Sequence, residues 1–415
     1  MSALRRIEGE LWMEGVRLAD VADRFGTPCY AYSRAAIEAG WRAFEEALGQ
    51  GPHLVCYAVK ANANLAVLGV LARLGSGFDI VSAGELARVL AAGGRADRTI
   101  FSGVGKSESD IRAALAAGIR CFNVESEPEL ERVNAVAAAM GARAPVSLRV
   151  NPDVDAGTHP YISTGLKGNK FGIPHERAID AYLLAARLPH LEVTGIACHI
   201  GSQILQLAPL EQALERVMDL VDSLAARGIG LSHIDLGGGL GIRYREEEEP
   251  PDIGGWCRTI ARRLAGRRLE IVVEPGRAVV GNAGVLLTRV EYLKLDKERR
   301  FAVVDCSMSE LLRPALYQAW HEIVPLSRLD RATAVYDVVG PVCESADVLG
   351  LDRELALAPG DRLAILSAGA YGMVMSSNYN ARPRPCEVMI DAGQAVVVRA
   401  RESIESLYAG ERTLD

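Results

Sequence analysis

The feature that most constrains the fold of this 415-residue chain is a regular alternation of short apolar runs with amphipathic segments between residues 33 and 280. Each run has the length and composition of a buried strand, and each intervening segment has the spacing of a helix. Such alternation predicts a parallel sheet, because consecutive parallel strands need a crossover connection. The eight runs are 54–59, 78–81, 99–102, 121–124, 146–150, 193–200, 233–236 and 269–273.

Eight strands with helices between them, over roughly 240 residues, predict a (β/α)8 TIM-type barrel. A doubly wound sheet is the alternative architecture. The alternation stops after Gly276, and the chain beyond it contains strand candidates with few helices between them, which predicts a β-rich second domain. These candidates are 285–292, 301–305, 334–339, 362–366, 387–390 and 395–399, and residues 1–32 form a lead-in with strand candidates at 11–16 and 29–32 and a helix that ends at Gly26.

The charge of the chain argues against nucleic acid or an anionic membrane as its main partner. The formal net charge is −7 and the pI is about 5.7, whereas phosphate binding needs a concentrated basic surface. The eight cysteines contain no CxxC pair, which fits neither a zinc site nor a disulfide framework and indicates a reducing cytoplasm. No signal-peptide pattern or membrane-spanning run occurs in the sequence. We therefore expect a soluble, cytoplasmic protein with a small-molecule partner.

One lysine, Lys60, follows the first of the eight runs in the sequence YAVKAN. Taken alone, a lysine just past a strand is most often a solvated surface side chain. The alternative is an amine desolvated by apolar walls, whose lowered pKa makes it a nucleophile able to form a Schiff base with an aldehyde cofactor. The ends of the other strands can decide between the two, because a barrel places its reactive groups at the carboxyl ends of its strands.

The later strand ends carry an imidazole, a glycine-rich loop and a carboxylate. His199 and Ser202 follow the sixth run, the sequence LGGGLG (236–241) follows the seventh, and EPGR (274–277) follows the eighth. Glycines let backbone amides approach an anion closely, and the last strands of a barrel commonly hold phosphate. These strand ends therefore predict an anion-binding site with ionisable groups beside it.

Three other kinds of site are not indicated. The glycine loop is not a dinucleotide fingerprint, since GxGxxG would require glycine at Ile242. Gly105-Lys106-Ser107 resembles the end of a Walker A loop, but Ile100 stands where its first glycine is needed. A metal hydrolase would need clustered histidine and carboxylate ligands, and no such spacing occurs, so we expect no metal site.

Taken singly, His199 is more often a packed core histidine, Glu274 a solvated carboxylate, and the glycine loop a tight turn. Together with an amine they match what pyridoxal 5'-phosphate requires: a lysine for the Schiff base, a flat ring against the pyridine, an anion cradle, and an acid at the ring nitrogen. A carboxylate at that nitrogen keeps it protonated, so that the ring can accept electrons. We therefore predict a pyridoxal-phosphate site built from Lys60, His199, the glycine loop and Glu274.

Several segments also resemble one family. YAVKAN (57–62), HIGSQI (199–204), GGGLG and EPGR resemble the fold-type III pyridoxal-phosphate decarboxylases. More specific segments are similar to the diaminopimelate decarboxylase branch of that family, and the resemblance covers nearly the whole chain from Gly26 to Arg384. These segments are NPDVDAGTHPYISTGLKGNKFGI (151–173), RPALY (313–317), GPVCES (340–345) and AGAYGMVMSSNYNARPRP (368–385).

The resemblance implies a role for each site residue. It implies that Lys60 carries the cofactor, that His199 stacks on the pyridine ring, and that Glu274 pairs with the ring nitrogen. The residues implied to hold the phosphate are Ser202, Gly238, Gly239, Gly276, Arg277 and Tyr371. The residues implied to hold the amino-acid substrate are Arg277, Arg313, Tyr317, Glu344 and Tyr371, and Cys343 is implied to protonate the reacting carbon.

The resemblance also implies an assembly and a reaction. The assembly is a homodimer in which Cys343 and Glu344 reach the active site of the other subunit. The domains are a barrel of residues 33–280 and a β-rich domain of residues 1–32 together with 281–415. The implied reaction is the decarboxylation of meso-2,6-diaminopimelate to L-lysine and carbon dioxide, the last step of lysine biosynthesis.

Three alternatives stay open. Residues 307–310 read Ser-Met-Ser-Glu where the family usually shows Gly-Met-Asn-Asp, so a decarboxylase of another carboxylated amine or diamino acid is the first. An amino-acid racemase is the second, and Glu274 opposes it, because racemases of this type normally place a cation at the ring nitrogen. A non-catalytic pyridoxal-phosphate carrier is the third, and the joint presence of Arg313, Tyr317 and Cys343 opposes it.

Overall fold

The computed structural model describes residues 3–155, 170–296, 298–328 and 330–414. The chain divides into two compact units. One unit comprises Glu38–Ile242 and Glu249–Val279, and the other comprises Met1–Ile37, Arg243–Glu248 and Val280–Asp415. The short segment Arg243–Glu248 therefore joins the second unit although it lies between two strands of the first.

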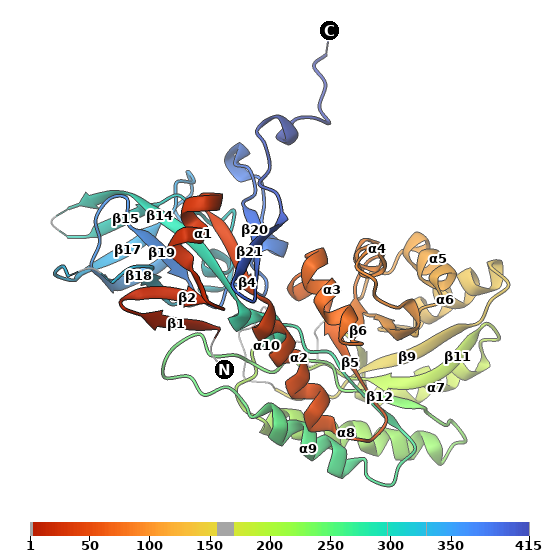
Figure 1. Ribbon diagram of the computed structural model, residues 1–415. Coiled ribbons are helices and arrows are strands. Elements are labelled where there is room, and N and C mark those ends of the chain that lie inside the picture. The colour runs from red at the N-terminus through yellow and green to blue at the C-terminus, as the bar shows by residue number, and fades with distance from the viewer. Residues whose placement is uncertain (1–2, 156–169, 297, 329, 415) are drawn as a thin grey trace. The chain divides into compact units, whose positions relative to one another are not determined.

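Eight parallel strands among the described residues of the first unit form a closed barrel (Figure 1). The order is β5-β6-β7-β8-β9-β11-β12-β13, and β13 pairs with β5 to complete the ring. This confirms the predicted (β/α)8 barrel and excludes a doubly wound sheet, which would have two unpaired edges. The strands are β5 (His53–Ala58), β6 (Gly77–Ile80), β7 (Thr99–Phe101), β8 (Cys121–Val124), β9 (Ala144–Asn151), β11 (Leu191–Ala197), β12 (His233–Asp235) and β13 (Glu270–Val273), and β10 (Ile173–Pro174) pairs with β9.

Helices alternate with these strands, as a parallel barrel requires. In the longest of those described, α8, the buried residues Leu210, Leu214, Val217 and Val221 recur every three or four positions, so one face packs inward. No helix of the described ranges combines the length and apolar character needed to cross a bilayer. The helices are α2 (Arg34–Leu48), α3 (Leu65–Arg73), α4 (Ala83–Ala91), α5 (Glu108–Ala117), α6 (Glu127–Ala139), α7 (Ala178–Arg187), α8 (Ala208–Ala225), α9 (Ile253–Arg263) and α10 (Arg277–Val280).

The interior of the barrel changes from apolar to polar along its strands. Cys121 on β8 and His233 on β12 meet across the interior, with Sγ 3.9 Å from Nε2. The residues two positions later on the same strands, Asn123 and Asp235, hydrogen-bond at 2.9 Å. Side chains two apart on a strand point to the same face, so polar groups gather inside the barrel at the carboxyl ends of the strands.

The second unit contains two sheets. A three-stranded antiparallel sheet is formed by β1 (Leu4–Ile7), β2 (Glu10–Met13) and β3 (Val16–Arg17), and the chain then enters α1 (Leu18–Phe25). The larger sheet runs β18-β17-β15-β14-β4-β20-β21, with β19 beside β14 and β16 beside β19. Its strands are β4 (Cys29–Ser33), β14 (Gly284–Leu295), β15 (Arg300–Val304), β16 (Ile323–Pro325), β17 (Ala334–Val339), β18 (Val348–Leu355), β19 (Arg362–Ile365), β20 (Cys386–Asp391) and β21 (Gln394–Arg399), and its helix is α11 (Arg313–Tyr317).

The N-terminal lead-in is part of this second unit because β4 lies between β14 and β20 and pairs with both. The helix that was predicted to end at Gly26 does so, with Gly26 at φ +74°. The single strand predicted over 11–16 is instead two strands, β2 and β3. Glu14 and Gly15 both take positive φ, 46° and 80°, and this two-residue turn reverses the chain.

Candidate active site

Lys60 lies in the 3-10 turn Val59–Ala61, directly after β5. Its Nζ donates a hydrogen bond of 2.5 Å to Oδ2 of Asp79 on the neighbouring strand β6. The Asp79 side chain is fully buried, whereas that of Lys60 is 36% exposed. The sequence left open a solvated lysine or an amine desolvated by apolar walls, and the structure shows neither: Lys60 is an ion-paired amine at the edge of solvent, because β6 supplies a carboxylate.

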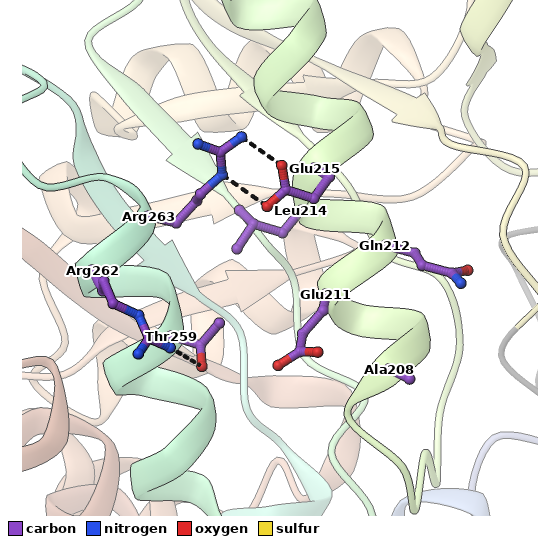
Figure 2. Close-up of a pocket in the computed structure, with 8 residues that line it drawn as sticks. All are labelled: Ala208, Glu211, Gln212, Leu214, Glu215, Thr259, Arg262 and Arg263. Atoms are coloured by element: carbon purple, nitrogen blue, oxygen red, sulfur yellow. Dashed lines mark hydrogen bonds and ion pairs between the residues drawn. The ribbon is translucent and has the colours of Figure 1, made fainter.

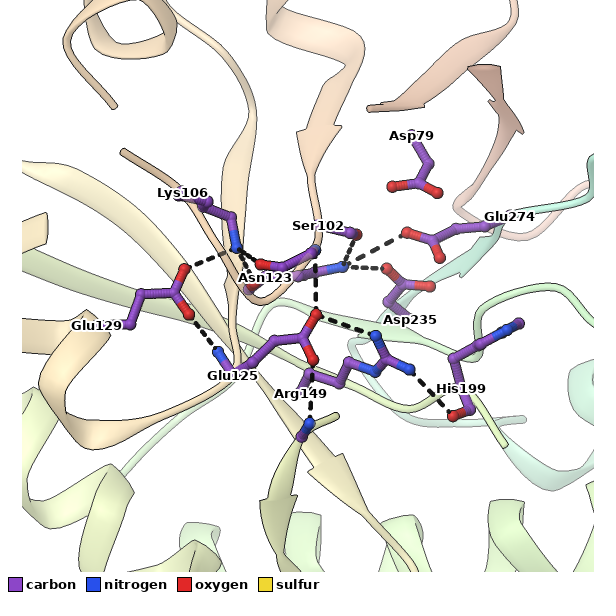
Figure 3. A network of polar contacts seen from close by, with 12 residues as sticks. Asp79, Ser102, Lys106, Asn123, Glu125, Glu129, Arg149, His199, Asp235 and Glu274 are labelled. Carbon is purple, nitrogen blue, oxygen red and sulfur yellow. Dashed lines mark hydrogen bonds and ion pairs between the residues drawn. The ribbon is translucent and has the colours of Figure 1, made fainter. Parts of the chain in front are cut away.

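Polar side chains from four other strand ends meet inside the barrel (Figure 3). The Asn123 amide nitrogen donates to Oδ2 of Asp235 at 2.9 Å and lies 3.4 Å from Oε1 of Glu274, the residue after β13. Oγ of Ser102, just past β7, is its third neighbour at 3.2 Å. An amide NH2 group has two hydrogens for these three oxygens. Asn123 lies between the two acids, with its shortest contact to Asp235 and its longest and weakest to Glu274.

The burial of these two acids changes their proton affinity. Removal from water raises the pKa of Glu274 well above its usual value, the charges of Asp235 and Asp79 raise it further, and Lys60 opposes them. Removal from water also raises the pKa of Asp235, against hydrogen bonds from Glu274, Asn123 and the Gly237 N–H group. Each charge disfavours ionisation of the other group, because like charges repel more strongly in a buried, low-dielectric interior.

His199 follows β11 and borders the glycine loop. The backbone N–H group of Gly238 points at its Nδ1 at 3.3 Å, so Nδ1 is the acceptor and the ring proton is on Nε2. Burial lowers the pKa of His199 well below its usual value, and the positive charges of Arg149 and Lys60 lower it further. The imidazole is therefore neutral, which suits a ring that packs flat against another aromatic ring.

The glycine loop packs too closely for side chains. A Cβ atom on Gly238 would lie 2.2 Å from the backbone oxygen of Glu274, and one on Gly239, where φ is +101°, would lie 2.5 Å from the oxygen of Gly201. Gly276 is enclosed in the same way, since its Cβ would lie 2.9 Å from that of Ala61, next to Lys60. The glycines therefore let four chain segments converge with their backbones exposed to a small anion.

Arg277 and Ser202 lie at the same end of the barrel. Arg277 begins α10, is buried, and donates from Nη2 to Oγ of Ser202 at 3.0 Å. Ser202 follows Gly201, which packs on the glycine loop. The structure thus brings together the predicted residues of the first unit, namely Lys60, His199, Ser202, Gly238, Gly239, Glu274, Gly276 and Arg277.

The sequence reasoning missed Asp79, Asn123, Asp235 and Arg149. The last of these, on β9, pairs with Glu125 at 3.0 Å and reaches the backbone oxygen of His199 at 3.4 Å. Each of the four is a polar residue within a largely apolar run. That was the available signal, because a polar residue near the end of a buried barrel strand points at the site.

Arg313 and Tyr317, predicted to hold the far end of the substrate, open and close α11 in the second unit. The Arg313 side chain is buried, its Nη1 lies 2.8 Å from Nε2 of His321, and its guanidinium carbon lies 4.6 Å from the centre of the Tyr244 ring. Nδ1 of His321 lies 2.8 Å from the backbone oxygen of Leu366 and so carries the ring proton, which leaves Nε2 to accept from Arg313. The guanidinium plane is therefore held in one orientation.

Cys343, Glu344 and Tyr371 also belong to the second unit. Cys343 and Glu344 are on an exposed loop, where the Cys343 N–H group donates to Oδ1 of Asn380 at 3.1 Å. Tyr371 adopts a positive φ of 55° in a turn after β19. Cys343 is exposed and the other cysteines of the chain are buried, so its thiol is the one that a second chain can reach.

The central part of the 151–173 motif, residues 156–169, lies outside the described residues. A cavity of about 670 Å³ opens between α8 and α9 (Figure 2), where Arg263 pairs with Glu215 at 2.5 Å and Arg262 contacts Thr259. That cavity contains none of the predicted site residues.

The residues present fit pyridoxal phosphate. A protonated ring nitrogen beside Glu274 would supply the positive partner that a buried carboxylate requires. The close-packed glycines, with Ser202 and Arg277 beside them, would hold the phosphate, and the neutral His199 ring would pack on the pyridine. A closed parallel barrel with a lysine, a neutral imidazole, a glycine loop and a buried acid at its strand ends defines the class of barrel-type pyridoxal-phosphate enzymes.

Comparisons with known proteins agree with this class. A family model described as pyridoxal-dependent decarboxylase, pyridoxal binding domain, matches residues 34–281. The diaminopimelate decarboxylase of Pseudomonas aeruginosa is 61% identical over 407 residues, 98% of each chain, and that of Pseudomonas fluorescens is 59% identical over 415 residues, 100% of each chain. The crystal structure of diaminopimelate decarboxylase from Helicobacter pylori complexed with L-lysine has a TM-score of 0.91 at 42% identity and covers 94% of this chain and 98% of that one.

The chain therefore belongs to the pyridoxal-dependent decarboxylases and, within them, to the diaminopimelate decarboxylase family. It is a carboxy-lyase with pyridoxal phosphate as its cofactor, which confirms the enzyme class and the cofactor predicted from the sequence.

Proposed function

We propose that this chain removes carbon dioxide from meso-2,6-diaminopimelate and forms L-lysine, the last step of lysine biosynthesis, in the cytoplasm. The observation that carries the proposal is the buried acid Glu274 at the end of β13, the strand that pairs with β5 and hence lies beside Lys60. An acid in that place keeps a neighbouring ring nitrogen protonated. The substrate and product are supported by the relatives named diaminopimelate decarboxylase and by the neighbour complexed with L-lysine.

When bound, pyridoxal phosphate supplies an aldehyde that amines attack and a ring that draws electrons from the reacting carbon. Lys60 provides the amine that holds the cofactor. Its ammonium group must lose a proton to act, and Oδ2 of Asp79, at 2.5 Å, orients the amine and favours its charged form. Glu274 holds a proton at the ring nitrogen, and that charge lowers the barrier to loss of carbon dioxide.

The remaining residues of the barrel orient the cofactor. His199 packs on the pyridine ring as a neutral imidazole, which adds no charge beside the ring nitrogen. Ser202, Gly238, Gly239 and the backbone of Gly276 and Arg277 bind the phosphate, and we propose that Tyr371 from the second unit adds a hydroxyl donor. Fixed donors around a phosphate are worth more at a partly buried site than in water, because the local dielectric is lower.

Arg313 selects the substrate in this proposal. A guanidinium held by His321 and Tyr244 can bind the distal carboxylate with two parallel hydrogen bonds. We propose that Tyr317, Arg277, Glu344 and Tyr371 bind the other polar groups of the substrate. An amino acid that lacks the distal carboxylate would leave the buried Arg313 without that anion, which disfavours its binding.

Residues 307–310, which precede RPALY and differ from the usual family pattern, form hydrogen bonds among themselves. Oε2 of Glu310 accepts hydrogen bonds from the N–H and Oγ of Ser307 at 2.6 and 2.7 Å, and the Ser309 N–H group donates to Oγ of Ser307 at 3.0 Å. Burial raises the pKa of Glu310, and the bonds from Ser307 oppose this. Because the Glu310 carboxyl group is used within its own turn, the departure is compatible with diaminopimelate as the substrate.

We further propose a homodimer with shared active sites. The support is the exposed loop of Cys343 and Glu344, in which the one exposed thiol of the chain stands beside a carboxylate. Cys343 of the other subunit would then protonate the carbon that has lost its carboxylate. A thiol suits this task because its proton is readily transferred near neutral pH.

Carbon dioxide release tests the proposed reaction. The purified protein, loaded with pyridoxal phosphate, is assayed with meso-, L,L- and D,D-diaminopimelate, L-lysine and L-ornithine, with Lys60→Ala as the inactive control. We expect kcat/KM for meso-diaminopimelate to exceed that for L-lysine and L-ornithine on the order of 100-fold or more, because both lack the distal carboxylate. Faster release from L-lysine or L-ornithine would show that the chain is a decarboxylase of another amine.

A further inference from the structure

Asp235 is a buried acid to which the proposed function gives no task. Its Oδ2 accepts from the Asn123 amide at 2.9 Å, and the same amide nitrogen lies 3.4 Å from Glu274 (Figure 3). Its Oδ1 accepts from the Gly237 N–H group at 2.8 Å. The Asp235 carboxyl group therefore contacts both Asn123, which lies next to Glu274, and Gly237, the first glycine of the loop.

The charges that face this pair are unbalanced. Asp79 on β6 adds a third carboxylate, and the cation that acts on Glu274 is Lys60, which itself pairs with Asp79. The Cys56 and Cys121 thiols on β5 and β8 also face the pair, but burial raises their pKa values and keeps them neutral. Repulsion between Asp235 and Glu274 is therefore relieved most directly by a proton held between them.

We propose that Asp235 is a positioning residue that acts through Glu274: the two acids share one proton before the cofactor binds, and that proton passes to the cofactor ring nitrogen. In this transfer the Glu274 O–H bond breaks and a ring N–H bond forms, and Glu274 remains as the carboxylate that accepts the new hydrogen bond. Asp235 stays ionised and, through Asn123, orients the Glu274 carboxylate toward the ring nitrogen. The inference rests on the proposed place of Glu274 at the ring nitrogen.

The alternative role of Asp235 is structural, since its Oδ1 also anchors Gly237. Two variants separate the roles. Asp235→Asn removes the charge and keeps an oxygen for the Gly237 N–H group, whereas Asp235→Ala removes both. Ser147→Ala is the matched control, because Ser147 is a buried polar residue on β9, in register with Asn123, and its hydroxyl makes no hydrogen bond to either acid.

The first experiment counts protons when pyridoxal phosphate binds to cofactor-free protein, by calorimetry at pH 7.5 in buffers of different ionisation enthalpy. In wild type the pair already holds the proton that the ring nitrogen needs. In Asp235→Asn and Asp235→Ala, Glu274 loses its charged neighbour, which favours its ionised form although burial still opposes it, so both variants should take up more protons from the buffer, at most one more per site. Ser147→Ala should match wild type, and Asp235→Ala alone should also bind the cofactor more weakly.

Wild-type proton uptake in both variants would overturn the shared proton. That result differs from failure of the proposed function, which would appear as wild-type protein that binds no cofactor or releases no carbon dioxide. A loss of affinity in both variants without a changed proton count would assign Asp235 to the loop alone.

A second measurement needs only protein without cofactor. Carboxyl groups of the unfolded chain lose their protons near pH 4 to 5, whereas the folded pair keeps one proton at higher pH. Above pH 5 the folded state therefore binds more protons than the unfolded state, and the free energy of unfolding falls as the pH rises. The melting temperature of Asp235→Asn should therefore fall less between pH 5 and pH 8 than that of wild type. Parallel curves for the two proteins would contradict the proposal, even if the variant melts at a lower temperature throughout.

Discussion

Lys60 and Asp79 form an ion pair of 2.5 Å that joins the turn after β5 to the buried end of β6. The carboxylate fixes the direction of the amine and stabilises its charged form, because an opposite charge at this distance favours ionisation. The pair therefore controls both where the amine points and how readily it gives up a proton.

Removal of the Asp79 charge should change the pH dependence of cofactor attachment. Attachment needs the neutral amine, and Asp79→Asn removes the charge that favours the ammonium form. The midpoint of the rise in attachment with pH should therefore move about 1 to 3 pH units lower. The measurement is the absorption of the attached cofactor across a pH series, with Ser147→Ala as the unshifted control. An unchanged or higher midpoint in Asp79→Asn would remove Asp79 from this role.

The identity of the reactive lysine is tested by colour and by labelling. The purified protein should be yellow, and Lys60→Ala should lose the absorption band of the lysine-bound cofactor. Lys294→Ala, on β14 of the other unit, should keep the band. Borohydride reduction followed by peptide mapping should place the label on Lys60, and a label on another lysine would show that the assignment is wrong.

Arg313→Ala should lose diaminopimelate turnover while it keeps the cofactor. The loss of a charge-assisted pair in a closed site costs about 2 to 4 kcal/mol in kcat/KM, on the order of 30- to 1,000-fold. Arg313→Lys should recover little, since an ammonium group cannot copy the two parallel hydrogen bonds. Arg299→Ala, an exposed arginine paired with Asp337, is the control and should stay near wild type. Steady-state kinetics that do not change in Arg313→Ala would exclude it from the site.

Mixed dimers test the shared site. Lys60→Ala and Cys343→Ala should each be nearly inactive, because every site then lacks a reacting group. In a two-fold dimer both changes can fall in one site and leave the other intact. Equal amounts of the two variants, refolded together with pyridoxal phosphate, should form about half mixed dimers and recover roughly a quarter of wild-type activity. Two tags of different size verify the mixing. Mixed dimers without recovered activity would mean that Cys343 acts within its own subunit or has no role.

The buried ion pair Lys106–Glu129 should be important for stability. The two groups are 2.7 Å apart, with side chains that are 1% and 7% exposed. Lys106→Ala leaves a buried carboxylate without its cation and should lower the free energy of unfolding by about 3 to 5 kcal/mol, whereas Lys106→Met with Glu129→Gln should recover part of the loss. Arg95→Ala breaks an exposed ion pair with Asp97 and should change the free energy of unfolding by about 0.5 kcal/mol or less. Urea denaturation measures all of these, and an equal effect of Lys106→Ala and Arg95→Ala would contradict the argument.

The strands that the sequence located were those with a strong local pattern. Cys121–Val124 and Ala334–Val339 agree with their predicted limits at both ends, because an apolar run bounded by turn residues signals a buried strand without any distant partner. Among the described residues, four strands were not predicted, namely β1, β10, β16 and β18. The first three have two to four residues, and β18 carries Gly350, Asp352 and Arg353. The formation of such strands depends on the strand that they pair with, and a local sequence pattern does not identify that partner strand.

The same distinction applies to the site. Lys60, His199 and Glu274 could be named from the sequence, since each follows an apolar run and has a chemistry that few other positions combine. Asp79, Asn123 and Asp235 were not named, because a polar residue inside a strand indicates the end of the barrel that holds the site but not the groups that it contacts. Asn123 is separated from Asp235 by 112 positions and from Glu274 by 151. The sequence determined where the strands lie and which groups stand at their ends, and only closure of the barrel, which pairs β13 with β5, decided which of those groups share a proton, a hydrogen bond or a charge.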